Sequence, residues 1–280
     1  YLGEVTGEKS DLKIREIMAH QAGLAAWIPF YQYTLEKQGV CDSNYCYAPN
    51  EFFSIKVANG LYLNQDYPDT MWRVIEETNI KNRGEYRYSD IGFFFLKRII
   101  DSMTRQSFDE FLAMNFYEPM GMDRTVFNAA EEFPLDQIVP TEYDTYFRNQ
   151  LVHGYVHDPA AAMLGGVAGH AGLFCNSNDL AKLFQMFLNN GTYGGSRYFS
   201  WNTIPHFTKK QFEGNRKGLG FDKPETDNDK ISPTHQYASP KAFGHTGFTG
   251  TCVWADPEYD LIYIFLSNRV HPTQNNRKLI

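Results

Sequence analysis

The 280-residue sequence predicts an α/β fold of the α+β kind, with a mainly helical part followed by a part built on an antiparallel sheet. Three observations predict it. Apolar stretches with helical spacing, such as Asp90–Met103, recur through the first two thirds. The chain ends on two strand-like runs, Thr249–Ala255 and Leu261–Asn268, joined by a turn. Glycine occupies three of the eight positions in Phe243–Gly250, and such a strand can pass very close to a neighbour.

The composition narrows the classes of function. Apolar residues make up 42% of the chain and aromatic residues 16%, which is enough for a sizeable core. The 26 basic residues are outnumbered by 33 acidic ones and form no run of five, so we expect no nucleic-acid partner. The longest apolar run, Ile91–Leu96, is too short for a membrane span, so we expect none.

The chain opens at Tyr1 rather than at a methionine. We therefore expect a processed or excised piece, in which absent targeting signals say nothing about location. We divide it into a mainly helical subdomain, residues 1–165, and the C-terminal part of an α/β subdomain, residues 166–280.

Local signals place the elements of these two parts. Ser107 precedes one expected helix and Ser177 or Asn178 opens another, and short polar residues of this kind cap helix N-termini. Residues 128–160 carry turn signals and little periodicity. The expected helices cover residues 10–23, 50–58, 69–77, 90–103, 108–117, 177–190 and a short stretch from 200, with a strand at 168–174.

The segment Tyr86–Asp90 stands just before the strongly apolar helix. Helix N-termini concentrate partial positive charge and free N–H groups. With Arg87 nearby, we expect this field to ease ionisation of the Tyr88 phenol, which would suit a general base or proton relay. The alternative is structural: Ser89 or Asp90 caps the helix, and Tyr88 packs beneath it.

Two histidine motifs allow competing interpretations. In Leu164–Phe174 four glycines surround His170, which fits either backbone packed under a pocket wall or a loop entering a strand. His153 and His157 have the i, i+4 spacing of a zinc site, but Gly154 argues against the helix that such a site requires. We therefore expect no metal and no cofactor.

The four cysteines fall into two groups. Cys175 and Cys252 lie in apolar surroundings and are expected to be core residues. Cys41 and Cys46 flank a polar loop, where a local disulfide in an oxidising compartment and two free thiols are equally compatible with the sequence.

Three segments, in this order, resemble the superfamily of serine β-lactamases and penicillin-binding proteins, in its class C and esterase branch. Leu12–Leu24 resembles the family's ITIRDLLTHTSGL helix and turn. Tyr88–Asp90 stands where the family has Tyr-x-Asn, and Pro119–Met122 matches PLGM. His245–Gly247 stands at the place of Lys-Thr-Gly. The resemblance covers almost the whole chain and implies a β-lactamase/transpeptidase-like fold, with an antiparallel sheet flanked by helices.

The resemblance also implies roles for these residues. Tyr88 would move protons to and from the nucleophile and the leaving group. Asp90 takes the position of an Asn that holds the network and the substrate amide, and its carboxylate lacks the two N–H donors of that amide. His245 takes the place of the Lys that supports Tyr88 and attracts a substrate carboxylate, although an imidazole titrates near neutrality.

The strand edge completes the implied site. Thr246 and Gly247 line it, and the backbone N–H of Phe248 would be one of two oxyanion donors. The implied partner is a small-molecule or peptide substrate, and the implied location is the periplasm or cell envelope. Ser267–Pro272 is similar to β-lactamase-like modules of larger envelope proteins, some fused behind family-3 glycoside hydrolases, which suggests an upstream glycoside hydrolase domain as a partner.

The family's nucleophile is the Ser of a Ser-x-x-Lys motif at the start of a buried helix, with Lys one turn later on the same face. The one match in this sequence is Ser10–Lys13, which overlaps the Leu12–Leu24 segment and precedes an amphipathic helix. We therefore expect Ser10 to be an N-cap. The nucleophile segment would then lie upstream of Tyr1, the fold would be incomplete at the N-terminus, and these 280 residues alone would be inactive.

Two functions follow. The first is a serine hydrolase of β-lactamase-like fold that acts through an acyl-enzyme on a peptide, ester or β-lactam. The second is a non-catalytic module that binds cell-wall material or braces a partner domain, motivated by Asp90 and His245, which depart from the lactamase pattern. A Tyr88 oxygen facing His245 across a cleft would favour the enzyme, and a Tyr88 buried in apolar packing would favour the module.

Overall fold

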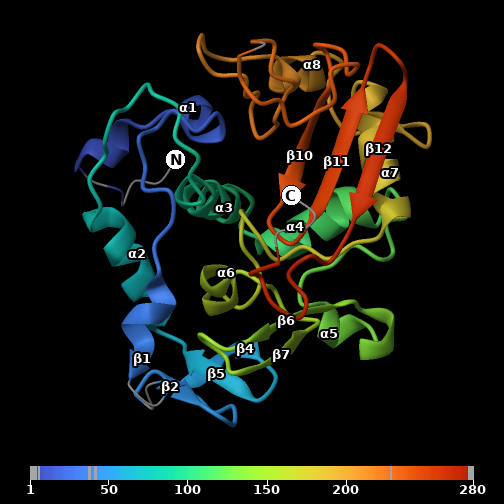
Figure 1. Cartoon of the computed structure of the whole chain (residues 1–280). Helices are drawn as coiled ribbons and strands as arrows, with labels where there is room; N and C mark the ends of the chain where they lie inside the picture. The colour runs from blue at the N-terminus through green and yellow to red at the C-terminus, as the bar shows by residue number, and fades with distance from the viewer. Residues whose placement is uncertain (1–4, 6, 37–38, 41–42, 228, 277–280) are drawn as a thin grey trace.

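The computed structural model describes residues 5, 7–36, 39–40, 43–227 and 229–276. Its central element is the long apolar helix α3 (Ile91–Thr104), which lies between the other N-terminal helices and a three-stranded sheet (Figure 1). The helices are α1 (Ile14–Met18), α2 (Tyr67–Glu77), α3, α4 (Phe108–Leu112), α5 (Ala129–Glu132), α6 (Pro159–Met163), α7 (Ser177–Leu188) and α8 (Thr203–Thr208), with shorter helical turns η1 (Gly7–Asp11), η2 (Phe30–Thr34), η3 (Ala113–Tyr117) and η4 (Leu135–Gln137).

The sheets of the described residues are small and antiparallel. The one that carries the glycine-rich motif has the order β10-β11-β12, and helix α7 packs on β11 and β12. A second three-stranded sheet, in the order β3-β5-β4, lies at the opposite end of the molecule (Figure 1). The strands are β1 (Leu35–Glu36) with β2 (Gly39–Val40), β3 (Tyr45–Cys46), β4 (Phe53–Ala58) and β5 (Leu61–Asn64), β6 (Pro140–Asp144) with β7 (Gln150–His153), β8 (Thr192–Tyr193) with β9 (Ser196–Arg197), and β10 (Phe243–Gly247), β11 (Thr251–Asp256) and β12 (Leu261–Leu266).

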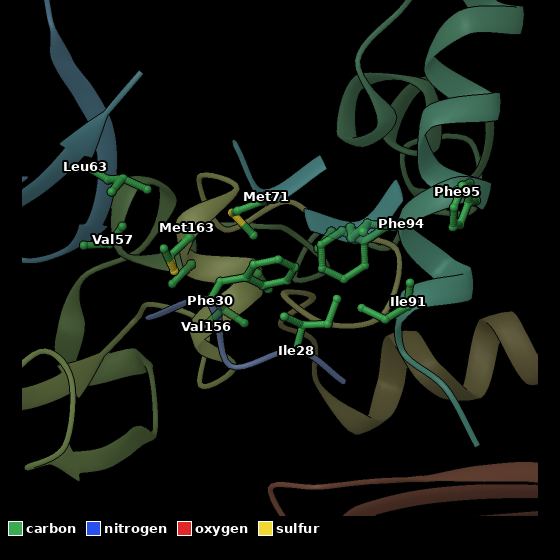
Figure 2. Packing of buried hydrophobic residues seen from close by; sticks show 14 of the residues in the cluster. Ile28, Phe30, Val57, Leu63, Met71, Ile91, Phe94, Phe95, Val156 and Met163 are labelled. Carbon is green, nitrogen blue, oxygen red and sulfur yellow. The ribbon is translucent and has the colours of Figure 1, made fainter. Parts of the chain in front are cut away.

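The main hydrophobic core surrounds the N-terminal half of α3 (Figure 2). Ile91 and Phe94 of α3 meet Phe30 there, with 6.1 Å between the centroids of the two phenylalanine rings. Burying a side chain of this size contributes about 2 kcal/mol to folding. A smaller core joins α7, α8 and the β10-β11-β12 sheet through Phe184, Ile204, Phe243 and Ala255. The larger core therefore fixes the start of α3, and with it the Tyr88–Asp90 segment.

Several sequence predictions are confirmed. The helix expected from Asp90 is α3, and Ser107 opens α4 through a reciprocal capping box with Glu110. Helices α2 and α7 also occur where expected, although Asn176, one residue earlier than predicted, caps α7. The C-terminal hairpin is β11 and β12, paired in register from Thr251↔Leu266 to Asp256↔Leu261.

Three local predictions are wrong. Residues 50–58 contain strand β4 rather than a helix, because a tight turn at Gly60 (φ 62°) folds the chain back into β5. The helix expected at 10–23 is divided into η1 and α1, and it stops where His20 takes a left-handed conformation (φ 56°). Residues 168–174 form no strand; Phe174 makes a single bridge to Val126.

The region 128–160 also holds more structure than its turn signals predict, since β6 and β7 pair there. The division of the chain at residue 165 stays a prediction. Within the described residues, no helix combines the length and the apolar character needed to cross a bilayer.

Candidate active site

Tyr88 is held at the start of α3 by bonds that reach the segment after α1. Ser89 is buried; its backbone N–H donates to Nδ1 of His20 (3.1 Å) and its hydroxyl donates to the Ala25 carbonyl (2.6 Å). The buried His20 ring lies against Tyr88, with 4.3 Å between centroids. Tyr88 itself keeps 43% of its surface exposed. Tyr88 is therefore not buried beneath the start of the helix, whereas Asp90 is the N-cap residue of α3, although its side chain forms no cap bond.

The Tyr88 phenol is not eased toward ionisation. Partial burial, followed by Asp90, Tyr86 and Asp222, raises the pKa of Tyr88 to about 12. The expectation of a lowered pKa is thus wrong, because desolvation and the nearby carboxylates outweigh the positive end of α3. At neutral pH the phenol of this chain is a hydrogen-bond donor.

Asp90 belongs to a cluster of three polar groups at the start of α3. Burial raises the pKa of Asp90, while His170 lowers it and Asp158 raises it. Nε2 of His170 bonds to Oδ1 of Asp158 (2.9 Å), and the His170 ring stacks on Phe94 with 4.7 Å between centroids. His170 is therefore packed against α3, and its glycine-rich segment approaches the α3 backbone at Gly169 without entering a strand.

The glycine-rich edge predicted from the sequence is strand β10. One side of β10 pairs with β11, in the register His245↔Val253 and Thr246↔Cys252. On its other side, Gly244 exchanges two backbone hydrogen bonds with Asp222 (2.7 and 3.1 Å). A Cβ added to Gly244 would collide with the Val253 carbonyl, so the close backbone approach expected of this strand is confirmed.

His245 faces Tyr88 from β10, with 6.2 Å between the ring centroids. Its Nδ1 lies 2.7 Å from the Thr246 carbonyl oxygen, which can only accept, so Nδ1 carries the proton and Nε2 of the neutral ring is an acceptor. Burial lowers the pKa of His245, the Thr246 carbonyl raises it, Lys217 lowers it and Asp222 raises it, for a net decrease. The structure thus brings Tyr88 and His245 together as expected.

Phe248 follows β10 in the turn to β11 and is exposed. Its ring lies 5.3 Å from His157 and 4.6 Å from the Arg269 guanidinium. Thr246 and Gly247 are exposed residues at the end of β10, and their place on an edge that lines the substrate stays a prediction. The oxyanion role of the Phe248 N–H stays a prediction.

Three residues at the site were missed from the sequence. His20 lies inside the Leu12–Leu24 segment of the resemblance, which is the signal that could have found it. Lys217 and Asp222 come from residues 211–222, where no sequence motif was recognised. Lys217 is buried, pairs with Asp222 (2.8 Å), and places its ammonium 5.8 Å from the centroid of Tyr88.

Other candidates lie apart from this site. The Ser10 hydroxyl is exposed and donates to the Gly7 carbonyl (2.7 Å), and Lys13 rather than Ser10 is the N-cap of α1. His153 bonds to the Ile138 carbonyl and His157 to Glu142, so the two rings of the zinc-like spacing have different partners. No group of three or more His, Cys, Asp or Glu residues suited to a metal occurs in the described part of the chain.

The cysteine predictions have mixed outcomes. Cys175 and Cys252 are half-buried, and burial raises the pKa of both thiols. Cys46 is a free thiol, and Cys41 lies outside the described residues. A hollow of about 530 Å³ against α8, lined from Ser200 to Lys209, contains none of the predicted site residues.

Comparison with solved structures supports the fold. A penicillin-binding protein homologue from Caulobacter crescentus superposes with a TM-score of 0.60 at 17% identity, covering 94% of this chain and 67% of that one. An octameric penicillin-binding protein homologue from Pyrococcus abyssi gives a TM-score of 0.57 at 19% identity, covering 92% and 54%. The fold is therefore β-lactamase/transpeptidase-like.

Comparison with curated proteins identifies relatives by sequence. A protein of Escherichia coli O157:H7 that carries the provisional name D-alanyl-D-alanine carboxypeptidase is 34% identical over 278 residues, covering 94% of this chain and 58% of the relative. A protein of the same name from Salmonella gallinarum is 32% identical over 292 residues, covering 99% and 62%. This chain thus spans about three fifths of the relatives' length. Because the family model described as Beta-lactamase also matches residues 1–280, the chain belongs to the Beta-lactamase family.

Proposed function

We propose that this chain is part of a serine hydrolase that acts through an acyl-enzyme on a peptide, ester or β-lactam. It would supply the proton relay, formed by Tyr88 with His245, and the strand edge β10. The observation that carries the proposal is the exposed Tyr88 facing His245, with 6.2 Å between ring centroids. The names of the relatives make peptides ending in D-alanyl-D-alanine the first substrates to test. Such substrates would place the enzyme in the periplasm or at the cell envelope.

The protonation states of the two rings support a proton relay in which Tyr88 donates and His245 accepts. Tyr88 carries a phenol with a pKa of about 12, and neutral His245 offers Nε2 as an acceptor. A phenol of this pKa becomes a useful base when a cation is placed beside its oxygen, because an opposite charge within 4–6 Å lowers the pKa by about 1–3 units. A lysine one turn after a nucleophilic serine would be such a cation.

We infer that this serine and lysine come from a Ser-x-x-Lys segment outside the 280 residues. Ser10 is a poor nucleophile, since its exposed hydroxyl donates to the Gly7 carbonyl within η1 rather than to a general base.

The experiment compares a longer chain, carrying the upstream sequence, with these 280 residues. Both are treated with a fluorescent penicillin, a fluorophosphonate and an activated ester, and hydrolysis of a D-alanyl-D-alanine peptide is followed. We expect labelling and turnover by the longer chain alone. Tyr88→Phe should slow turnover by at least about 100-fold, the contribution of a positioned proton relay.

Tyr259→Phe is the matched control, because Tyr259 is an exposed tyrosine in the turn between β11 and β12. It should leave turnover close to the wild-type rate. A longer chain that forms no adduct with any reagent would contradict the hydrolase and favour the non-catalytic module that binds cell-wall material. Robust turnover by the 280 residues alone would contradict the external nucleophile.

A further inference from the structure

A buried lysine stands beside the two rings of the site. Lys217 is 4% exposed, and its ammonium lies 5.9 Å from the centroid of Tyr86 and 5.8 Å from that of Tyr88. A cation over an aromatic face is attracted by the ring, and more strongly where water is excluded. Lys217 is therefore held beside the rings of Tyr86 and Tyr88.

The lysine is held there by an ion pair. Its Nζ lies 2.8 Å from Oδ2 of Asp222, and the same carboxylate receives two bonds from Arg216, at 2.7 and 3.0 Å. A buried charge needs a partner to offset its desolvation. Two cations here share one carboxylate, so the cluster keeps a net charge of +1.

Backbone contacts carry this cluster across the site. Asn215 donates from its side chain to the Ala19 carbonyl (2.9 Å), and the Gly220 N–H donates to the Met18 carbonyl (3.0 Å). At its other end, Asp222 is paired with Gly244, the residue before His245. Residues 215–222 thus connect the wall that holds Tyr88 with the strand that holds His245.

We propose that Lys217 is a positioning residue of this site: paired with Asp222 and lying over the rings of Tyr86 and Tyr88, it holds a buried positive charge beside Tyr88 and the neighbouring His245 and sets Tyr88 against β10. The site would then keep a cation even though His245 occupies the position of the family's lysine. Its part in catalysis rests on the proposed hydrolase function, whereas the test below needs no turnover.

The groups that face His245 allow a test that predicts the direction in which its pKa changes in each variant. Lys217 and Asp222 act on it from residues 215–222, the Thr246 carbonyl from its own strand, and Tyr88 and His20 from the opposite wall. Burial lowers the pKa of His20 to about 4, so that ring stays neutral while His245 titrates. Lys217 opposes protonation of His245, and Asp222 favours it.

The experiment is an NMR titration of the imidazole nitrogens in the ¹⁵N-labelled 280-residue chain, with His245 assigned from the signal lost in His245→Asn. We expect His245 to titrate below its ordinary value of 6.5 in the wild type. Lys217→Met should move its pKa upward and Asp222→Asn should move it downward. Lys223→Met is the control, because the Lys223 ammonium bonds to backbone carbonyls at Lys241 and Ala242 and should leave the titration unchanged.

Shifts of opposite sign would support a charge that acts on His245, since a loss of packing alone would not reverse sign between two neighbours. Shifts in the same direction, or a Lys217→Met shift no larger than that of the control, would overturn the proposal. If neither variant folds, the wild type decides: titration of His245 at or above 6.5 would overturn it. A hydrolase that fails to label leaves this readout intact, so the two failures are distinguishable.

Discussion

The two walls of the site are built in different ways. The helical wall, with His20, Tyr88 and Ser89, rests on the main core around α3 and on hydrogen bonds from buried side chains. The strand wall, β10, rests on glycine backbone contacts and on a core of four buried residues. The helical wall is therefore fixed by packing, while the place of the strand wall depends on its neighbours in the sheet and on residues 215–222.

The largest expected effect is a loss of folding stability at acidic pH, caused by His20 of the helical wall. Burial lowers the pKa of His20 to about 4, so on acidification the unfolded chain takes up the proton first. The contribution of neutral His20 to the free energy of unfolding is fully present above about pH 6.5. It is lost as the pH falls toward 4, by about 3 kcal/mol in all. Urea denaturation over this pH range measures the loss.

His20→Asn is the matched variant, because Asn tolerates the left-handed backbone of this position and does not titrate. The slope of stability against pH should be smaller in this variant. An unchanged slope would show that other groups cause the acid sensitivity.

The next effect concerns the strand wall. Gly244→Ala places a Cβ against the Val253 carbonyl, so β10 and β11 must separate. We expect a loss of about 2 kcal/mol in the free energy of unfolding, as for overpacking in a core. Thr246→Ala on the same strand should cost clearly less, and equal losses would mean that the close approach at Gly244 does not matter.

The smallest effect tests the connection between the walls. Asn215→Ala removes the bond to the Ala19 carbonyl and the acceptor of the Lys217 N–H. We expect a loss of about 1 kcal/mol, the value of a buried hydrogen bond. Asn202→Ala is the control, because Asn202 is exposed and makes no side-chain cap bond to α8. A control that loses as much stability would contradict a special role for Asn215.

The sequence predicts the parts of this fold that depend on local signals. Helix α3, the Ser107 capping box and the β11–β12 hairpin each carry a pattern within a few residues. Strand β4 was mistaken for a helix although Asn59-Gly60, a hairpin signal, follows it. Residues 168–174 were mistaken for a strand because apolar glycine-rich sequence does not reveal that Gly169 packs on the α3 backbone at Phe93.

In the candidate site, too, only the residues that a local motif marks could be predicted from the sequence. Tyr88 and His245 were found because motifs mark them, and their approach to 6.2 Å agrees with that expectation. The expected direction of the Tyr88 pKa shift is wrong because the shift comes first from burial and then from Asp90, Tyr86 and Asp222, and the burial of a side chain is a tertiary property that no local motif gives. Lys217 could not be found because its meaning comes from tertiary contacts with two tyrosines and one carboxylate.

The measurement that tests the proposed function most directly is the position of the covalent adduct, a phosphonate ester from the fluorophosphonate or an acyl ester from the penicillin. The longer chain would be labelled with a fluorophosphonate or a penicillin, digested with trypsin and mapped by mass spectrometry. The account predicts an adduct on a serine of a Ser-x-x-Lys segment outside the 280 residues, formed much more slowly in Tyr88→Phe. An adduct on Ser10, or an adduct whose rate is unchanged in Tyr88→Phe, would contradict it.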